Sequence, residues 1–188
     1  SLKGAVAEAD IVFLNVPVGM IAEIVRDMAP SLKPGAIVTD VGSVKKSVMD
    51  AVYEHLTENT TFVPAHPIAG TELSGPEAGF AELFDNRWCI LTPDSETDKQ
   101  AVQTISDLWR AMGSDVEIMD ADHHDLVLAI TSHVPHLIAF NIVGTAADLE
   151  AVTQSEVIKY SAGGFRDFTR IAASEPVMWR DVFMNNGE

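Results

Sequence analysis

The sequence contains a single cysteine, few basic residues and no long uninterrupted apolar run, and each shortage excludes a class of protein. Cys89 has no intrachain partner for a disulfide, which fits a reducing compartment such as the cytoplasm. Lys and Arg number 12 against 28 Asp and Glu, and the net charge of −16 repels phosphate backbones and anionic lipid. No apolar run reaches the ~20 residues of a membrane span. We therefore expect a soluble, cytoplasmic protein that binds neither nucleic acid nor membrane.

A further absence concerns glycine. A dinucleotide-binding sheet opens with a strand, a Gly-x-Gly-x-x-Gly turn and a helix, and this turn holds the pyrophosphate. The chain has 12 glycines but lacks this motif, and Gly163-Gly164 lies among helical patterns rather than after a strand. We therefore expect this chain alone to bind a dinucleotide weakly.

Hydrophobic residues make up 47% of the sequence, which is enough for a large buried core. Over the first 119 residues, short apolar runs alternate with amphipathic stretches. This alternation predicts an α/β fold, a partial Rossmann-like and mostly parallel sheet wrapped by helices. The predicted strands are 11–16, 36–41, 61–66, 88–92 and 116–119, and the predicted helices are 20–28, 46–56 and 98–112.

The character of the sequence changes after Met119, where only helical patterns follow. These patterns cover 125–145, 149–160 and 166–171. The change predicts two domains, with the sheet in residues 1–119 and an all-helical domain in residues 120–188.

The densest group of candidate site residues follows the third predicted strand, in the segment HPIAGTELSG at 66–75. His66 lies at the carboxyl end of that strand, where open α/β sheets bind their ligands. Its ordinary pKa suits a general base near neutral pH, and Glu72 is close enough in sequence to orient it. A histidine that merely ends a strand and a glutamate in a solvated loop is an equally good interpretation of the spacing.

The neighbouring predicted strand ends in a similar way, with DVGSVK at 40–45. The turn at Gly42 and Ser43 enters a helix, so its backbone N–H groups and the Ser43 hydroxyl could contact an anion or a nicotinamide. As a bare motif, an ordinary helix N-cap at Ser43 is the favoured interpretation.

Two histidine-containing segments precede or lie within the long helical pattern. His133 and His136 are three residues apart and share a helix face, where they could point into a cleft. A metal site is not expected, because no cysteine or carboxylate stands at ligand spacing from them. His123-His124-Asp125 is interpreted as a helix start with exposed side chains.

The helical region also concentrates its few basic residues near its end. Arg166 and Arg170 are one helical turn apart, and Asp167 is placed to pair with Arg170. An arginine held by a carboxylate is well suited to bind a substrate carboxylate through two hydrogen bonds. A salt-bridged helix surface explains the same pattern equally well.

Taken together, these segments resemble the prephenate dehydrogenase family. The matching segments are DVGSVK at 40–45, HPIAGTELSG at 66–75, SHVPH at 132–136, GFRDFTRIA at 164–172 and SEPVMWRD at 174–181. Their order and approximate spacing agree with the family from near Ala9 to the end of the chain. The resemblance implies a nicotinamide-binding domain followed by a helical domain that dimerises. It also implies oxidation and decarboxylation of prephenate to 4-hydroxyphenylpyruvate with hydride transfer to NAD or NADP.

The resemblance also assigns roles to residues. His66 would bind the C4 hydroxyl of the substrate and help remove its proton, and Ser43 would contact that hydroxyl and the nicotinamide. Arg170, held by Asp167, would bind a substrate carboxylate. Trp179 would lie near the site, within its own chain or from the partner subunit. The other substrate contacts would be Thr71, Glu72, His133, His136 and Arg166, and the cofactor contacts Val16, Pro17, Asp40, Gly42 and Ser43.

Several alternatives stay open at this point. The substrate is prephenate or arogenate, and the cofactor preference is not readable because the phosphate-binding glycines are absent. For the same reason we expect the chain to be a fragment of the enzyme. Another two-domain nicotinamide-dependent dehydrogenase is a rival, although it would carry a lysine on the helix that here contains His133 and His136. The second rival is a non-catalytic dimerisation or ligand-binding module.

Overall fold

The computed structural model describes residues 1–71, 73, 75–153 and 156–187, and its first part contains two three-stranded sheets. The first sheet is parallel and contains β1 (Ile11–Leu14), β2 (Ile37–Asp40) and β3 (Thr61–Val63), in that order. The second contains β4 (Ala65–Pro67), β5 (Trp88–Leu91) and β6 (Asp115–Ile118). Here β4 is antiparallel to β5, and β5 is parallel to β6. The two sheets together form a Rossmann-like, mostly parallel strand layer, as the sequence predicts.

The third predicted strand, 61–66, is wrong as a single element. Proline interrupts it at position 64, because a proline has no N–H for the ladder. The carbonyl of Pro64 instead accepts a hydrogen bond at 3.1 Å from the backbone N–H of Thr92, which directly follows β5 of the second sheet. The chain therefore changes sheets at this residue, and His66 lies opposite Ile90 in the β4–β5 pair.

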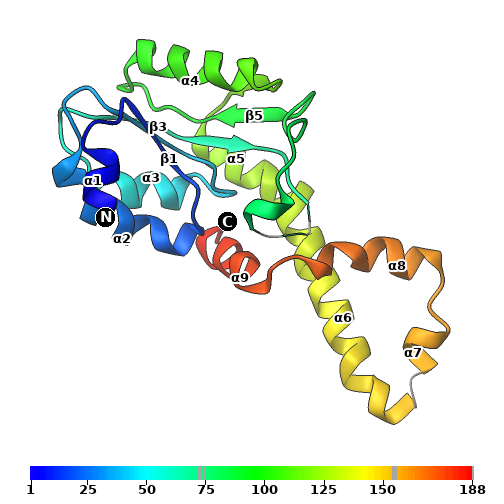
Figure 1. Cartoon of the computed structure of the whole chain (residues 1–188). Coiled ribbons are helices and arrows are strands. Elements are labelled where there is room, and N and C mark those ends of the chain that lie inside the picture. The colour runs from blue at the N-terminus through cyan, green and yellow to red at the C-terminus, as the bar shows by residue number, and fades with distance from the viewer. Residues whose placement is uncertain (72, 74, 154–155, 188) are drawn as a thin grey trace.

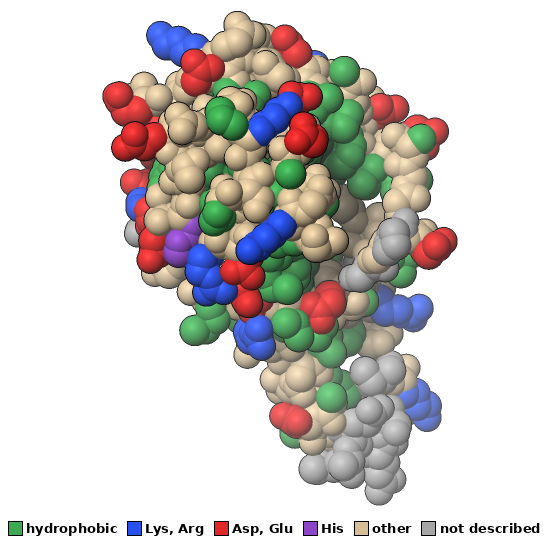
Figure 2. All heavy atoms as spheres, turned by 60° about the vertical axis from the view of Figure 1, so that its left-hand side comes forward, with side chains coloured by type: hydrophobic (Ala, Val, Ile, Leu, Met, Phe, Trp, Pro, Cys, Tyr) green, Lys and Arg blue, Asp and Glu red, His purple; other side chains and the backbone are tan. Residues whose placement is uncertain are grey.

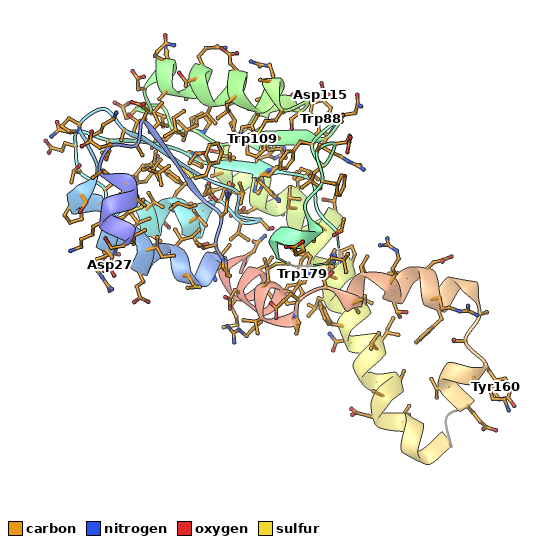
Figure 3. The ribbon with its side chains drawn as sticks, in the orientation of Figure 1. Asp27, Trp88, Trp109, Asp115, Tyr160 and Trp179 are labelled. Carbon is orange, nitrogen blue, oxygen red and sulfur yellow. The ribbon has the colours of Figure 1, made fainter. Side chains whose placement is uncertain are left out.

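Helices cover both faces of the strand layer (Figure 1). One face carries α1 (Leu2–Val6), α2 (Ile21–Met28) and α3 (Lys46–Tyr53), and the other carries α4 (Lys99–Ala111). α2 buries Ile21, Val25 and Met28, which share a helix face. From α4, Trp109 points toward the sheet (Figure 3) and packs edge-on against Phe13 at 6.1 Å between ring centroids. Each helix thus contributes an apolar stripe to a core on its side of the sheet.

After β6 the described chain is helical, again as predicted. Its elements are α5 (Ala121–Leu128), a π-helical turn (Ala129–His133), α6 (Val134–Thr153), α7 (Glu156–Lys159), α8 (Gly163–Thr169), a 3₁₀ turn (Arg170–Ala173) and α9 (Pro176–Asn185). Asp120 caps α5 by accepting the N–H groups of Asp122 and His123. The wide π turn directly precedes Pro135, whose ring would otherwise clash with the preceding turn of a regular helix.

The last helix returns to the first part of the chain. α6, α7 and α8 project away from the sheet, whereas α9 lies beside α2 (Figure 1). Trp179 and Val182 of α9 belong to the same buried cluster as Ile21 and Val25. At Gly19 a Cβ would come within 2.8 Å of an Asp181 carboxylate oxygen, so the close approach of α9 depends on this glycine. This packing joins the helical region to the sheet.

One helical stretch, Ala121–Leu149, is long and apolar enough to cross a membrane by length and composition, with a mean hydropathy of 1.7. The sequence predicts no such segment, because histidines and other polar residues interrupt the apolar run. In the structure these residues do not end the helix, so the stretch is long enough. Figure 2 shows hydrophobic side chains at the surface where the projecting helices leave the sheet. The exposed large apolar residues of this stretch are Leu126, Ile130, Val134, Leu137, Ile138, Ile142, Val143 and Leu149.

Candidate active site

Three strand ends converge on one pocket. Asn15 follows β1, Ser43 follows β2 and His66 lies in β4, and all three line a pocket with a volume of about 460 Å³. Pockets of roughly 300–1,000 Å³ are typical of small-molecule sites. The remaining lining residues are Phe13, Val41, Pro67, Ala69, Leu83, Phe84, Trp109 and Met112. The pocket thus combines apolar walls with a few polar groups at the carboxyl ends of the strands, where α/β sheets bind ligands.

A buried ion pair shapes the turn beneath this pocket. Asp40 and Lys45 are both completely buried, and the Lys45 ammonium donates to the Asp40 carboxylate at 2.5 Å and to the Ala65 carbonyl at 2.6 Å. The same carboxylate accepts the N–H groups of Gly42 at 2.8 Å and Ala65 at 3.0 Å. Burial lowers the pKa of Lys45, and the attraction of Asp40 opposes this shift. These bonds fix the end of β2 against the start of β4, and so Ser43 relative to His66.

His66 is the buried titratable group of the pocket wall, with 8% of its surface exposed. Burial lowers its pKa well below the ordinary value of 6.5, and the nearby charge of Lys45 lowers it further. His66 is therefore neutral at pH 7. Its Nδ1 lies 2.8 Å from Nε2 of His124. Because Nδ1 is occupied in this way, Nε2 is the ring nitrogen left for a ligand.

Behind His66, a histidine and an aspartate continue the hydrogen-bonded chain. His124 Nδ1 lies 2.8 Å from the Asp125 carboxylate. That carboxylate also accepts the backbone N–H groups of Lys45 at 2.8 Å and Lys46 at 2.9 Å, at the start of α3. Burial alone would raise the pKa of Asp125, but the hydrogen bonds from His124 and from these backbone groups outweigh it and lower the pKa. Asp125 is therefore ionised at neutral pH.

A second aromatic cluster lies where α6 meets α9. The imidazole of His136 stacks on the Trp179 indole with ring centroids 3.6 Å apart, and His133 meets the same indole edge-on. The Asn186 amide lies 3.0 Å from His133 Nδ1 and donates to the Asp125 carbonyl at 2.9 Å. Within the described part of the chain, no polar group pairs with Trp179 Nε1. This cluster ties the C-terminal helix to the segment that carries His124 and Asp125.

The sheet and the helical region each match a known sequence family. Residues 2–118 match the family described as prephenate dehydrogenase, nucleotide-binding domain, and residues 120–188 match prephenate dehydrogenase, dimerization domain. The chain belongs to the prephenate dehydrogenase family.

Individual members of the prephenate dehydrogenase family are similar along almost the whole chain. Cyclohexadienyl dehydrogenase of Zymomonas mobilis is 48% identical over 98% of this chain and 63% of that protein. Prephenate dehydrogenase of Bacillus subtilis is 37% identical over 99% of this chain and 50% of that protein. The crystal structure of Aquifex aeolicus prephenate dehydrogenase in complex with hydroxyphenyl propionate and NAD+ has a TM-score of 0.90 and 39% identity, over 99% of this chain and 64% of that one. The chain thus spans between 50% and 63% of the two curated relatives.

The structure brings some of the residues predicted from the prephenate dehydrogenase motifs together. His66 and Ser43 share the pocket. Gly42 is buried beneath it, whereas Val16 and Pro17 lie at the end of β1. Asp40 is also buried, and its carboxylate is occupied by Lys45 and two backbone groups. It therefore shapes the turn. The expected cofactor contact of Asp40 stays a prediction.

Other predicted residues lie elsewhere. Arg166 lines a separate pocket of about 480 Å³ between α6 and α8. Asp167 in α8 and Arg170, at the start of the 3₁₀ turn, are exposed. Thr71 is exposed in the loop after β4, and Glu72 lies outside the described residues. Trp179 packs against His133 and His136 of its own chain.

The expectation for His123-His124-Asp125 is wrong for two of its three members. His123 is exposed, but His124 is completely buried and Asp125 is 2% exposed. The signal that could have revealed this is the spacing of Ala121, His124, Asp125 and Leu128, which forms one buried face of α5. The expectation failed because adjacent polar residues were taken to face solvent. Among the described residues, no group of three or more His, Cys, Asp or Glu side chains could hold a metal ion.

Acidification is expected to destabilise the fold through the buried histidines. Burial lowers the pKa of His133 from 6.5 to about 4, although Asp125 opposes the shift. Between these pH values the unfolded chain binds more protons than the folded one, so stability is complete above pH 6.5 and falls as the pH approaches 4. Denaturant unfolding at several pH values should show this slope, and His133→Gln should reduce it. An equal slope in the variant would contradict the assignment.

Proposed function

We propose that the protein to which this chain belongs catalyses the oxidative decarboxylation of prephenate to 4-hydroxyphenylpyruvate in tyrosine biosynthesis, with NAD or NADP as the hydride acceptor. The observation that carries this proposal is the neutral, buried His66, which lines a pocket at the carboxyl ends of the strands together with Ser43. Membership of the prephenate dehydrogenase family supports the reaction class. A neutral imidazole has the free lone pair that a general base needs.

The pocket fits the nicotinamide end of the cofactor. Apolar side chains such as Phe13 and Leu83 suit a flat ring, and Asn15 and Ser43 supply polar groups for a carboxamide. We assign the contacts of the cofactor to Val16, Pro17, the Gly42 backbone and Ser43. When bound, the nicotinamide supplies the acceptor for the hydride that leaves C4 of the substrate.

The chain's own residues orient the substrate and accept its proton. In this mechanism His66 accepts the C4 hydroxyl proton at Nε2, and Ser43 holds the same hydroxyl in place. The O–H bond breaks, an N–H bond forms on His66, and C4 becomes a carbonyl carbon as it loses its hydride. When the ring carboxylate leaves as CO2, the electrons of its bond enter the ring, and the oxygen takes the proton back from His66 as the ring becomes an aromatic phenol. Since aromatisation drives the reaction, the main task of the protein is to position the ring and its hydroxyl.

We assign the substrate's other groups to the helical region. Arg170 binds a substrate carboxylate, because a guanidinium matches a carboxylate with two parallel hydrogen bonds. Asp167, one turn away in sequence, orients it. Thr71, Glu72, His133, His136, Arg166 and Trp179 are the further proposed substrate contacts. Arogenate differs from prephenate only in its side chain, and these residues are where the choice between them would be made.

A direct spectrophotometric assay tests the reaction. The protein is mixed with prephenate or arogenate and excess NAD+ or NADP+, and the absorbance of reduced nicotinamide is followed. His66→Asn should lower the turnover rate by a factor of about 10²–10⁴, the usual contribution of a general base. The exposed His123→Asn serves as the matched control and should leave the rate unchanged. Equal rates for His66→Asn and the natural protein would contradict the proposal. A protein that binds these ligands without turnover would be a non-catalytic module.

We further propose that the helical domain, residues 120–188, forms a cytoplasmic homodimer, and that residues 1–119 form the nucleotide-binding unit. The support is the apolar surface of the π-helical turn and α6, where Ile130 of the turn is 66% exposed and Ile138 of α6 is 45% exposed. Contiguous apolar surface of this kind marks interaction sites in soluble proteins. A dimer interface also accounts for a helix whose composition would allow it to cross a membrane. The match of residues 120–188 to the prephenate dehydrogenase dimerization domain also supports a homodimer.

A further inference from the structure

A chain of three side chains, Asp125, His124 and His66, runs from the start of α3 to the pocket. Each link is 2.8 Å long. His124 is completely buried and Asp125 almost so, and they come from α5, whereas His66 comes from β4. The link between His66 and His124 joins residues 58 positions apart in sequence. Buried polar atoms need hydrogen-bond partners, and these links provide them for both nitrogens of His124 and for Nδ1 of His66.

The direction of the hydrogen bonds is fixed at the Asp125 end. An ionised carboxylate can only accept, and Asp125 is kept ionised by the N–H groups of Lys45 and Lys46, which are fixed donors. His124 Nδ1 must therefore carry a proton and donate it to Asp125. With a neutral His124, the other nitrogen is an acceptor, so His124 Nε2 accepts from His66.

The same logic determines the state of His66. Its Nδ1 must carry the proton that is donated to His124, and its Nε2 therefore has a free lone pair. The opposite tautomer would place two lone pairs, or two protons, against each other at 2.8 Å. Because His66 lines the pocket and its Nδ1 is engaged by His124, this lone pair is the one left to accept a substrate proton.

We propose that Asp125 and His124 are positioning residues that hold His66 in the tautomer protonated at Nδ1, so that Nε2 is ready to act as the base. This inference deepens the proposed function and rests on it. When Nε2 takes the hydroxyl proton, the Nδ1–H bond stays intact and its hydrogen bond to His124 becomes charge-assisted, hence stronger. The negative charge of Asp125 stabilises the imidazolium through His124. In the Ser-His-Asp triad, a buried aspartate has the same effect on a catalytic histidine.

Two substitutions of His124 separate this role from simple packing. His124→Phe keeps the ring shape but removes the acceptor for His66 Nδ1–H, whereas His124→Gln keeps an acceptor near the same position. We expect the Phe variant to lower kcat by about 10²-fold, in the range of a lost orienting partner, with KM changed by less than about threefold. The kcat of the Gln variant should be at least about tenfold higher than that of the Phe variant. His123→Phe, at the exposed neighbouring position, should match the natural protein.

Nitrogen-15 NMR of the histidine rings measures the tautomer directly and does not depend on turnover. The His66 signals are identified by their loss in His66→Asn. In the natural protein we expect the His66 proton on Nδ1, and in His124→Phe a shift of the population toward Nε2–H. A His66 proton on Nε2 in the natural protein overturns the inference, and so does a fully active His124→Phe variant. If the natural protein turns over neither substrate, the proposed function fails, and the NMR result still decides the tautomer.

Discussion

Replacing Lys45 with methionine is expected to lower the free energy of unfolding by about 3–5 kcal/mol, the usual cost of removing one member of a buried ion pair. The loss arises because the Asp40 carboxylate would keep its charge in a site without water. Lys45 and Asp40 are both completely buried, and the ammonium also binds the Ala65 carbonyl. Urea unfolding followed by circular dichroism measures the change. Methionine matches the length of the lysine side chain, so packing is largely preserved.

The neighbouring lysine provides the control for this prediction. Lys46 also forms an ion pair, with Asp50 at 2.6 Å, but both side chains are more than half exposed. Exposed pairs contribute about 0–1 kcal/mol, so Lys46→Met should change stability by less than about 1 kcal/mol. The double variant Asp40→Asn with Lys45→Met should be more stable than Lys45→Met alone, because it removes the uncompensated charge. Equal losses at positions 45 and 46 would contradict the assigned role of burial.

The buried pair also links stability to the site. Asp40 holds the Gly42 N–H and the Ala65 N–H, and these residues directly precede Ser43 and His66, which line the pocket. A protein that keeps its fold after substitution at position 45 would still lose the fixed spacing between these two groups. We therefore regard the DVGSVK segment as a structural unit that positions Ser43, in addition to any contact with the cofactor.

The alternation of strands and helices could be predicted because each apolar run is short and bounded by proline, glycine or a capping residue. Asp98 and Asp120 both cap helices, at α4 and α5. The break at Pro64 was missed, since an apolar run through a proline looks continuous when only hydrophobicity is considered. Because proline has no backbone N–H, the strand cannot continue its hydrogen-bond ladder with the first sheet at Pro64 and pairs with the second sheet instead.

The residues that line the candidate site at the strand ends could be predicted, whereas the buried residues that hold them in place could not. His66 and Ser43 were identifiable because they follow strands at the carboxyl edge of the sheet. His124 was not, because its partner is 58 residues away and only the packing of α5 against the sheet brings the two rings together. The buried pair of Asp40 and Lys45 was hidden for a related reason. Charged residues are normally exposed, and only the fold shows that these two neutralise each other.

Substituting Ile138 with glutamate is expected to convert the protein from dimer to monomer, with the dissociation constant raised by more than about 100-fold. Ile138 lies on the exposed apolar face of α6 together with Val134 and Ile142, one turn away on either side. In a two-fold symmetric interface each substitution occurs twice, and each buried carboxylate without a partner costs several kcal/mol, about tenfold in affinity per 1.4 kcal/mol. Sedimentation velocity over a concentration series measures the change.

Ile118→Glu is the matched control, because this isoleucine is also about half exposed but lies on β6, away from the projecting helices. It should leave the dimer intact, and both variants should keep the unfolding midpoint of their sheet domain. A dimer of unchanged affinity in Ile138→Glu would place the interface elsewhere. A natural protein that stays monomeric and binds lipid vesicles through α6 would instead identify the apolar face as a membrane surface. We favour the dimer because the net charge of −16 is repelled by anionic membranes. Two copies that meet through an apolar face keep most of their charges far apart, where salt screens the repulsion between them.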